Sequence, residues 1–167
     1  GEFYLNNNVN DATQMREALA YEMFRQAGIA APRTAFARVF LTIPGRVEKR
    51  HLGLYTVVEA VEGGFLERAL GTRKGLLMKP EMMSGVQYMG DDWSAYRERF
   101  HPEQTPGEID PAVTEGFIEF LRLIQQTEPA RFAEAMKKYL DPDAFGRFVA
   151  INAVLANVDS FIGNGHN

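Results

Sequence analysis

The first patterned segment of the chain predicts a helix. Asp11 precedes a run composed mostly of strong helix formers, and Gly28 follows that run. Aspartate is favoured at a helix start and glycine at a helix end, because each helps to satisfy the terminal peptide groups. We therefore predict a helix over residues 12–27.

Two segments rich in strand formers come next. Thr34–Ile43 and Leu52–Val61 are rich in Val, Phe, Tyr, Thr and Leu, and Pro44, Gly45 and a basic stretch at residues 46–50 lie between them. β-branched and aromatic residues favour strands, whereas Pro-Gly favours a turn. The pattern predicts an antiparallel hairpin.

The middle of the chain has weaker patterns. Two glycines lead into an expected short helix at Phe65–Leu70, and Leu76–Pro80 resembles a short strand that proline ends. Residues 80–111 mix Pro, Gly, Asp and scattered aromatics without a sustained period. They predict an irregular connection with one helical turn around Ser94–Phe100.

The last third of the chain has helical spacing. Apolar residues three or four apart mark one face of a helix. Three such sets after Pro111 predict three successive helices and, with the hairpin, an α+β fold with a mixed lobe and a helical lobe. The sets are Val113, Phe117, Phe120, Leu121 and Ile124; Phe132, Met136 and Leu140; and Phe145, Phe148, Val149, Asn152 and Leu155.

Composition narrows the class of protein. The chain has 167 residues, of which 46% are hydrophobic and 24% charged, as is typical of one globular domain. No apolar stretch approaches the roughly 20 residues of a membrane helix, so we expect no membrane span. The net charge of −4 argues against a general nucleic-acid binder. Zero Cys excludes disulfides, Cys-ligated zinc and thiol catalysis.

The charge is distributed unevenly. Residues 1–100 carry 13 basic and 12 acidic groups, whereas residues 101–167 carry 5 and 10. This change predicts two modules that meet near residue 100.

Three charged residues interrupt or end apolar segments and are candidate site residues. On a helical wheel Glu22 falls inside the apolar arc, which predicts a buried carboxylate paired with a catalytic Lys or a metal. The alternative is that Glu22 extends to water at the edge of the arc or pairs with a structural Arg. Glu17 lies opposite and is expected to be solvated. Glu59 ends a strand where ligand contacts often lie, or it only marks the strand exit. Lys79 ends a Leu-Leu-Met run and reaches either a phosphate or water.

The closing segment places polar groups after an apolar helix. Asp159 is followed five residues later by Asn164 in a Gly-rich loop. In phosphoryl transfer an Asp orients the attacking hydroxyl and an Asn holds Mg²⁺, and this spacing is that of the protein-kinase catalytic loop. Ordinary turn chemistry at a helix end is the alternative. His166 does not indicate a hydrolase, because no nucleophilic Ser elbow accompanies it.

Eight segments of the chain occur in an order that is typical of one protein family. They are Leu5–Asn8, Asp11 with Met15–Tyr21, Gly28–Thr34, Gly53–Tyr55 with Val58 and Glu59, Phe65 with Leu66, Leu77–Lys79, Tyr88 with Gly90, and Asn157–Asp159 with His166 and Asn167. Together they resemble the spore-coat protein H (CotH) kinase family over nearly the whole chain.

The resemblance implies an atypical protein kinase-like fold. Residues 1–62 would form part of the small lobe, a helix plus an antiparallel hairpin, and the hinge; residues 63–111 would form a connecting segment, and residues 112–167 the helical large lobe up to the catalytic loop. The implied activity is transfer of the γ-phosphoryl group of ATP, with Mg²⁺ or Mn²⁺, to Ser or Thr of a protein substrate. The implied location is extracytoplasmic, at a cell surface or in a spore coat.

The resemblance also implies roles for individual residues. It makes Asp159 the catalytic residue, places Glu22, Glu59 and Lys79 at the nucleotide, and places Asn164 and Asn167 on the metal.

Two elements of the family pattern do not occur within residues 1–167. One is a Gly- and Ser-containing segment with a nucleotide-binding Lys, and the other is a Trp-Asp-x-Asp element with a metal-binding Asp; the only Trp, Trp93, precedes Ser94. We therefore expect an internal piece of a kinase domain with little activity in isolation. The alternative is a non-catalytic coat or cell-surface interaction module that retains the kinase-like fold.

Overall fold

The computed structural model describes residues 2–73, 75–80, 86–104, 109–160 and 162–163, and of Gln104 only the backbone. It divides into two compact units, Gly1–Arg73 and Lys74–Asn167. The boundary therefore lies at residues 73–74 and not near residue 100. The connecting segment expected at residues 63–111 is shared between the two units.

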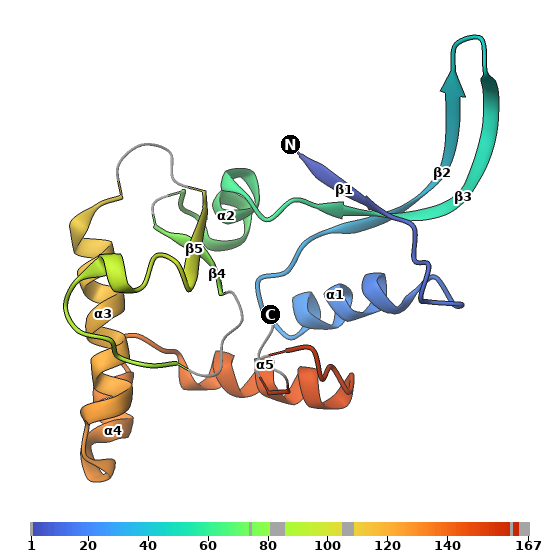
Figure 1. Ribbon diagram of the computed structural model, residues 1–167. Helices are drawn as coiled ribbons and strands as arrows, with labels where there is room; N and C mark the ends of the chain where they lie inside the picture. The colour runs from blue at the N-terminus through green and yellow to red at the C-terminus, as the bar shows by residue number, and fades with distance from the viewer. Residues whose placement is uncertain (1, 74, 81–85, 105–108, 161, 164–167) are drawn as a thin grey trace. The chain divides into compact units, whose positions relative to one another are not determined.

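The first unit is built on a three-stranded antiparallel sheet (Figure 1). Strands β2 (Thr34–Ile43) and β3 (Val47–Glu59) form the predicted hairpin, which is confirmed. Strand β1 (Phe3–Asn6) pairs with the other edge of β3, so that the strand order is β1-β3-β2. β3 starts five residues earlier than predicted, because its basic stretch pairs with the end of β2.

Helix α1 (Arg16–Gln26) starts later than predicted. The carboxylate of Asp11 accepts hydrogen bonds from Thr13 Oγ1 at 2.7 Å and from the backbone N–H of Arg16 at 2.8 Å. Gln14 has a φ of 58°, which is left-handed and cannot continue a helix. Asp11 therefore caps a turn before the helix, and the Thr13 hydrogen bond lowers the pKa of Asp11 to about 2.

Helix α2 (Gly63–Leu70) completes the first unit. Phe65 is buried, and Gly71 ends the helix in the left-handed conformation with a φ of 70°. This is the usual glycine C-cap, which a residue with a side chain adopts only at a cost.

The second unit begins with a two-stranded antiparallel sheet. Strand β4 (Leu77–Pro80) pairs with β5 (Phe100–Gln104), and the 3₁₀ turn η1 (Trp93–Ala95) precedes β5. β4 was predicted, but β5 was not, because residues 100–104 have little strand propensity and acquire their conformation by pairing with β4.

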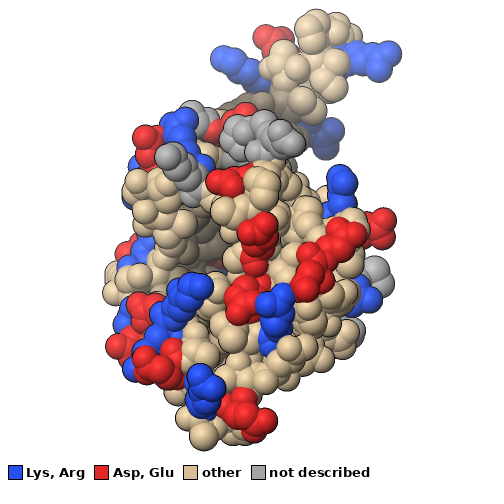
Figure 2. Space-filling model, turned by 90° about the vertical axis from the view of Figure 1, so that its left-hand side faces the viewer, with Lys and Arg blue, Asp and Glu red and all other residues tan. Residues whose placement is uncertain are grey.

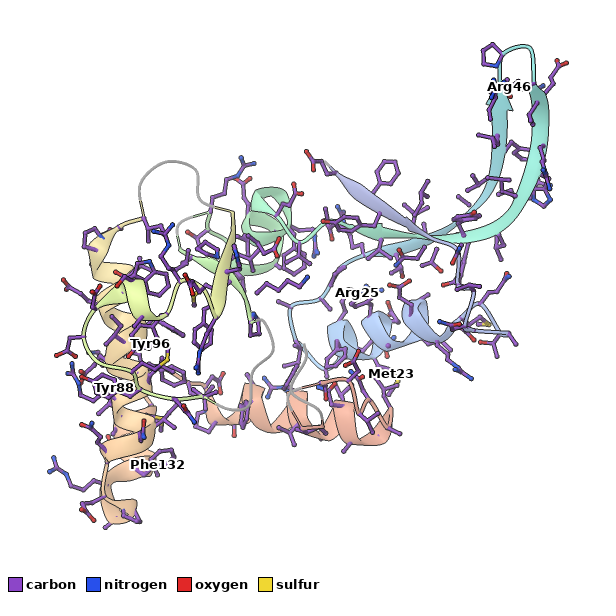
Figure 3. The ribbon with its side chains drawn as sticks, in the orientation of Figure 1. Met23, Arg25, Arg46, Tyr88, Tyr96 and Phe132 are labelled. Atoms are coloured by element: carbon purple, nitrogen blue, oxygen red, sulfur yellow. The ribbon has the colours of Figure 1, made fainter. Side chains whose placement is uncertain are left out.

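An aromatic core holds the second unit together (Figure 3). Tyr96 is completely buried, and its hydroxyl accepts from Met89 N–H at 2.7 Å and donates to the Gly90 carbonyl at 2.6 Å. The ring of Phe117 meets Tyr96 edge-on at 6.2 Å between centroids. Residues from the irregular connection are therefore part of the core.

Three helices end the chain as predicted. They are α3 (Pro111–Gln126), α4 (Pro129–Met136) and α5 (Pro142–Val154). Each has proline in its first turn, where no hydrogen-bonding N–H is needed, and Asp110 and Asp141 cap α3 and α5. In its described residues the protein is thus a mixed α/β structure with two antiparallel sheets and five α-helices.

Candidate active site

Helix α5 leads directly into the loop that carries Asp159. The carboxylate of Asp141 accepts from the backbone N–H groups of Asp143 at 2.9 Å and Ala144 at 3.1 Å, which fixes the start of the helix. At the other end Asn152 is 1% exposed, although its neighbours in the second half of the helix are apolar. A buried amide of this kind needs partners for both its donor and its acceptor.

Asn152 finds these partners in the helix and in the loop. Its Nδ2 donates to the Phe148 carbonyl at 2.9 Å, and its Oδ1 accepts from Nδ2 of Asn157 at 2.9 Å. The Asn157 backbone N–H also donates to the Asn152 carbonyl, and Ser160 Oγ donates to the Asn157 carbonyl at 2.6 Å. We call Asn152, Asn157 and Ser160 the amide relay: Asn157 links the loop to α5 before Asp159, and Ser160 closes the loop onto Asn157 after it.

The loop is also closely folded on itself. Gly163 N–H donates to the Ser160 carbonyl at 2.9 Å. A Cβ on Gly163 would lie 2.7 Å from Cα of Val158 and closer still to its carbonyl group, so only glycine fits there. Asp159 lies within this turn and is exposed, while its neighbour Ser160 is buried. The carboxylate is thus presented to solvent from a fixed backbone.

The other residues of the expected site occupy two units. Asn164 and Asn167 lie outside the described residues. Lys79 is exposed on β4, opposite His101 of β5 in the strand register, and belongs to the same unit as Asp159. Glu22 and Glu59 belong to the first unit.

The predicted burial of Glu22 is wrong. Its side chain is 48% exposed, and its carboxylate accepts from Arg25 and, at 2.8 Å, from Gln26. These two hydrogen bonds, with Gln26 contributing most, lower the pKa of Glu22. Arg25 also donates to the Pro32 carbonyl, so the pairing with a structural Arg is the arrangement observed. The helical wheel failed because α1 buries none of its residues fully, so its apolar arc does not mark a core.

Glu17, which was expected to be solvated, has a partner on a different element. Its Oε1 accepts from Nδ2 of Asn6, at the end of β1, at 2.7 Å. Burial raises the pKa of Tyr21, and the negative charge of Glu17 adds to this shift. The contact joins α1 to the sheet, which a wheel analysis of one helix cannot detect.

Glu59 is the centre of an ion-pair cluster. Its carboxylate accepts from Arg33 N–H at 3.0 Å and Arg33 Nη2 at 2.9 Å, and from Arg68 Nε at 3.1 Å and Arg68 Nη2 at 2.6 Å. The side chain is 14% exposed, and Arg68 is the main cause that lowers the pKa of Glu59 to about 2. Glu59 therefore connects the end of β3 to α2 and to the residue before β2.

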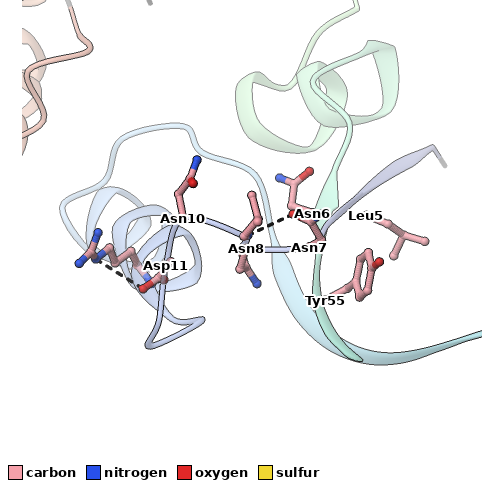
Figure 4. A pocket seen from close by; sticks show the side chains of 9 residues that line it. Leu5, Asn6, Asn7, Asn8, Asn10, Asp11 and Tyr55 are labelled. Atoms are coloured by element: carbon pink, nitrogen blue, oxygen red, sulfur yellow. Dashed lines mark hydrogen bonds and ion pairs between the residues drawn. The ribbon is translucent and has the colours of Figure 1, made fainter. Parts of the chain in front are cut away.

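An open pocket in the first unit was not predicted (Figure 4). It has a volume of about 570 Å³ and lies between the asparagine-rich loop at residues 6–10 and Tyr55. Most of its amides already have protein partners; Asn8 Nδ2, for example, donates to the buried Oγ1 of Thr56 at 2.8 Å. The sequence signal was the Asn-Asn-Asn run, whose side chains bond to α1 (Asn6), within the loop (Asn7) and to the sheet (Asn8).

The described residues contain no group of three or more His, Asp or Glu side chains placed to hold a metal ion. A nucleotide-associated Mg²⁺ needs few protein ligands, because one or two carboxylates and the substrate phosphates supply its oxygen donors. The metal ligands expected from the sequence, Asn164 and Asn167, lie outside the described residues. No helix in the described part of the chain is long and apolar enough to cross a membrane.

The comparison with protein families agrees with the segments found in the sequence. The family described as CotH kinase protein matches residues 1–167. The chain therefore belongs to the CotH kinase family. No curated protein sequence gives a significant match to it.

Proposed function

We propose that this chain is part of a protein kinase that transfers the γ-phosphoryl group of ATP to a Ser or Thr hydroxyl of a protein. Family membership supports a kinase-like protein. The observation that carries the proposal is the amide relay, which holds the loop around Asp159 while the carboxylate remains exposed.

In this proposal Asp159 accepts the proton of the acceptor hydroxyl. The hydroxyl oxygen forms a bond to the γ-phosphorus, the bond from the γ-phosphorus to the bridging oxygen breaks, and ADP leaves. Because such a transition state is loose, the protein contributes mainly position and charge stabilisation. The amide relay supplies the position, since it fixes the backbone on both sides of the carboxylate.

The nucleotide and metal contacts are part of the same proposal. Mg²⁺ or Mn²⁺ on ATP would neutralise developing phosphate charge, with Asn164 and Asn167 as amide oxygen donors. Lys79 would contact phosphate from β4. The carboxylate of Glu59 already accepts hydrogen bonds from Arg33 and Arg68. Contacts between the end of β3 and adenine would therefore come from backbone groups. Glu22 would contribute to nucleotide binding indirectly, by orienting the guanidinium group of Arg25.

The test is radiolabelled phosphate transfer from ATP to a Ser- and Thr-rich protein, measured on the full-length protein. Asp159→Asn keeps the size of the side chain but cannot accept the proton, so we expect transfer to fall by a factor of about 10² or more. Asp143→Asn, an exposed aspartate on the first turn of α5, is the matched control and should retain wild-type transfer. Wild-type transfer by Asp159→Asn would refute the role of this loop.

The same assay addresses the non-catalytic alternative. A full-length protein that folds and binds a partner but transfers no phosphate with either Mg²⁺ or Mn²⁺ would be an interaction module with the same fold.

A further inference from the structure

The end of the β2–β3 hairpin is a two-stranded ribbon. β1 pairs only with Thr56–Glu59 of β3, so residues 47–55 of β3 pair with β2 alone. Figure 1 shows the ribbon extending away from the rest of the sheet. Two-stranded ribbons are marginally stable by themselves and commonly gain stability from a further partner.

The outer edge of β2 lacks the usual protection of an edge strand. No described strand pairs along it, and Thr34–Ile43 contains a single charged residue, Arg38, with no Pro or Gly. The pairing of β2 with β3 has two irregularities, and in both the extra residue belongs to β3. One lies between Gly53 and His51 and the other between Arg50 and Val47. β2 itself is therefore a regular strand without bulges. Natural edges are normally protected by prolines, bulges or several charges, because unpaired peptide groups attract other strands.

The ribbon also exposes apolar side chains. Its large apolar residues, each more than a third exposed, are Phe36, Phe40, Leu41, Ile43, Leu52 and Leu54. Apolar side chains that alternate along an open edge provide the pockets by which an added strand is recognised.

Positive charge collects at the end of the ribbon. Arg46, Lys49 and Arg50 are opposed there by Glu48 alone, and residues 38–52 carry a charge of +3 in a chain whose net charge is −4. Lysine and arginine side chains predominate on the end of the hairpin at the top of Figure 2, and Arg46 lies at its tip in Figure 3. No described carboxylate forms an ion pair with these three cations.

We propose that the outer edge of β2 binds an extended acidic segment of a partner protein as an additional strand. The peptide groups of β2 supply backbone hydrogen bonds, and Arg46, Lys49 and Arg50 select acidic side chains in the incoming segment. An extended polypeptide is favoured over a membrane or a nucleic acid because only a polypeptide can pair with the strand edge. The acidic remainder of the chain also opposes general binding to polyanions.

Binding is measured without nucleotide, so the result is independent of the proposed phosphoryl transfer. The probe is a fluorescently labelled 12-residue peptide of alternating Glu and Val. Its binding to the full chain is measured by fluorescence anisotropy. One control peptide has Lys in place of Glu, and the other keeps the Glu-Val sequence but is N-methylated at every peptide group, so that neither of its edges can donate a backbone hydrogen bond. We expect binding of the unmodified Glu-Val peptide only, since the Lys peptide carries the opposite charge and the N-methylated peptide cannot pair with the strand.

Two charge-reversal variants locate the site. Arg46→Glu, Lys49→Glu and Arg50→Glu together should weaken peptide binding on the order of tenfold or more. The matched control reverses Arg131, Lys137 and Lys138 near α4, which changes the net charge equally and should leave binding unchanged. Far-UV circular dichroism checks that both variants fold.

Several outcomes would overturn the proposal. Equal binding of the N-methylated peptide would show that charge alone acts, and equal loss in the α4 variant would show that the hairpin is not the site. Binding to anionic phosphatidylserine vesicles without binding to the peptide would assign the surface to membranes. A dimer in light scattering that the acidic peptide does not dissociate would assign the edge to a second copy of the chain.

Discussion

The side-chain amide of Asn157 donates to the side-chain oxygen of Asn152 at 2.9 Å and links the loop that carries Asp159 to the last turn of α5. Asn152 is buried, whereas Asp159 is exposed. The loop is therefore anchored from inside the fold, while Asp159 itself lies at the surface.

Replacement of Asn152 by Leu should show whether the hydrogen bonds of Asn152, and not only its burial, anchor the loop that carries Asp159. The apolar side chain fills the same space but leaves Nδ2 of Asn157 without its acceptor, which costs about 1–3 kcal/mol in unfolding free energy. Urea unfolding followed by far-UV circular dichroism measures this loss. The control Asn10→Leu changes an exposed asparagine and should shift unfolding by less than about 0.5 kcal/mol. Equal shifts in the two variants would contradict the anchoring role.

Gly163→Ala should disturb the loop with little effect on the rest of the unit. Its Cβ meets the backbone of Val158, so the turn must open, and hydrogen exchange across residues 155–163 should become faster. Gly146→Ala is the opposite case, because nothing lies within 4 Å of a Cβ there in the middle of α5. That substitution should stabilise the chain by roughly 0.5–1 kcal/mol. Unchanged exchange in Gly163→Ala would show that the close contact with Val158 is absent in solution.

Glu59 should make stability depend on pH in the acid range. Its pKa is about 2 in the folded protein, below the value near 4.5 for a free glutamate, so its contribution is complete above about pH 4.5 and is lost as the pH falls toward 2. The free energy of unfolding of Glu59→Gln should be lower than that of the wild type by on the order of 2 kcal/mol at pH 6, and the difference should shrink near pH 2. Urea titrations at both pH values measure it.

The control for this prediction is Glu48→Gln. Glu48 is exposed on the hairpin and forms no ion pair with any described residue. Its unfolding curves should coincide with those of the wild type at both pH values. A Glu59→Gln variant that loses the same stability at pH 2 as at pH 6 would mean that charge does not hold this cluster together.

Tyr96→Phe should destabilise the aromatic core. The change removes a hydroxyl that accepts from Met89 and donates to Gly90, and it leaves both groups without that partner at a cost of about 1–2 kcal/mol. Trp93, the only tryptophan, stacks on Tyr96 at 6.3 Å, so its fluorescence reports unfolding of this core directly. Tyr4→Phe, at a position 56% exposed, is the control and should leave the unfolding midpoint unchanged.

The sequence by itself determined the elements whose signals are local. Apolar residues three or four apart identified α3, α4 and α5, and a Pro-Gly turn between β-rich segments identified the hairpin. The ordered segments also identified the CotH kinase family, which matches the whole chain. Such features depend on neighbours within a few residues, and these neighbours can be read directly from the chain.

Only the tertiary structure decided the features that depend on residues far apart. β1 exists because it pairs with β3 about fifty residues later, and β5 because it pairs with β4. The exposure of Glu22 and the engagement of Glu59 by Arg33 and Arg68 depend on which elements pack nearby. Strand pairing and the burial of a charge are set by such distant partners, since neither the propensity of four residues nor a helical wheel contains information about them.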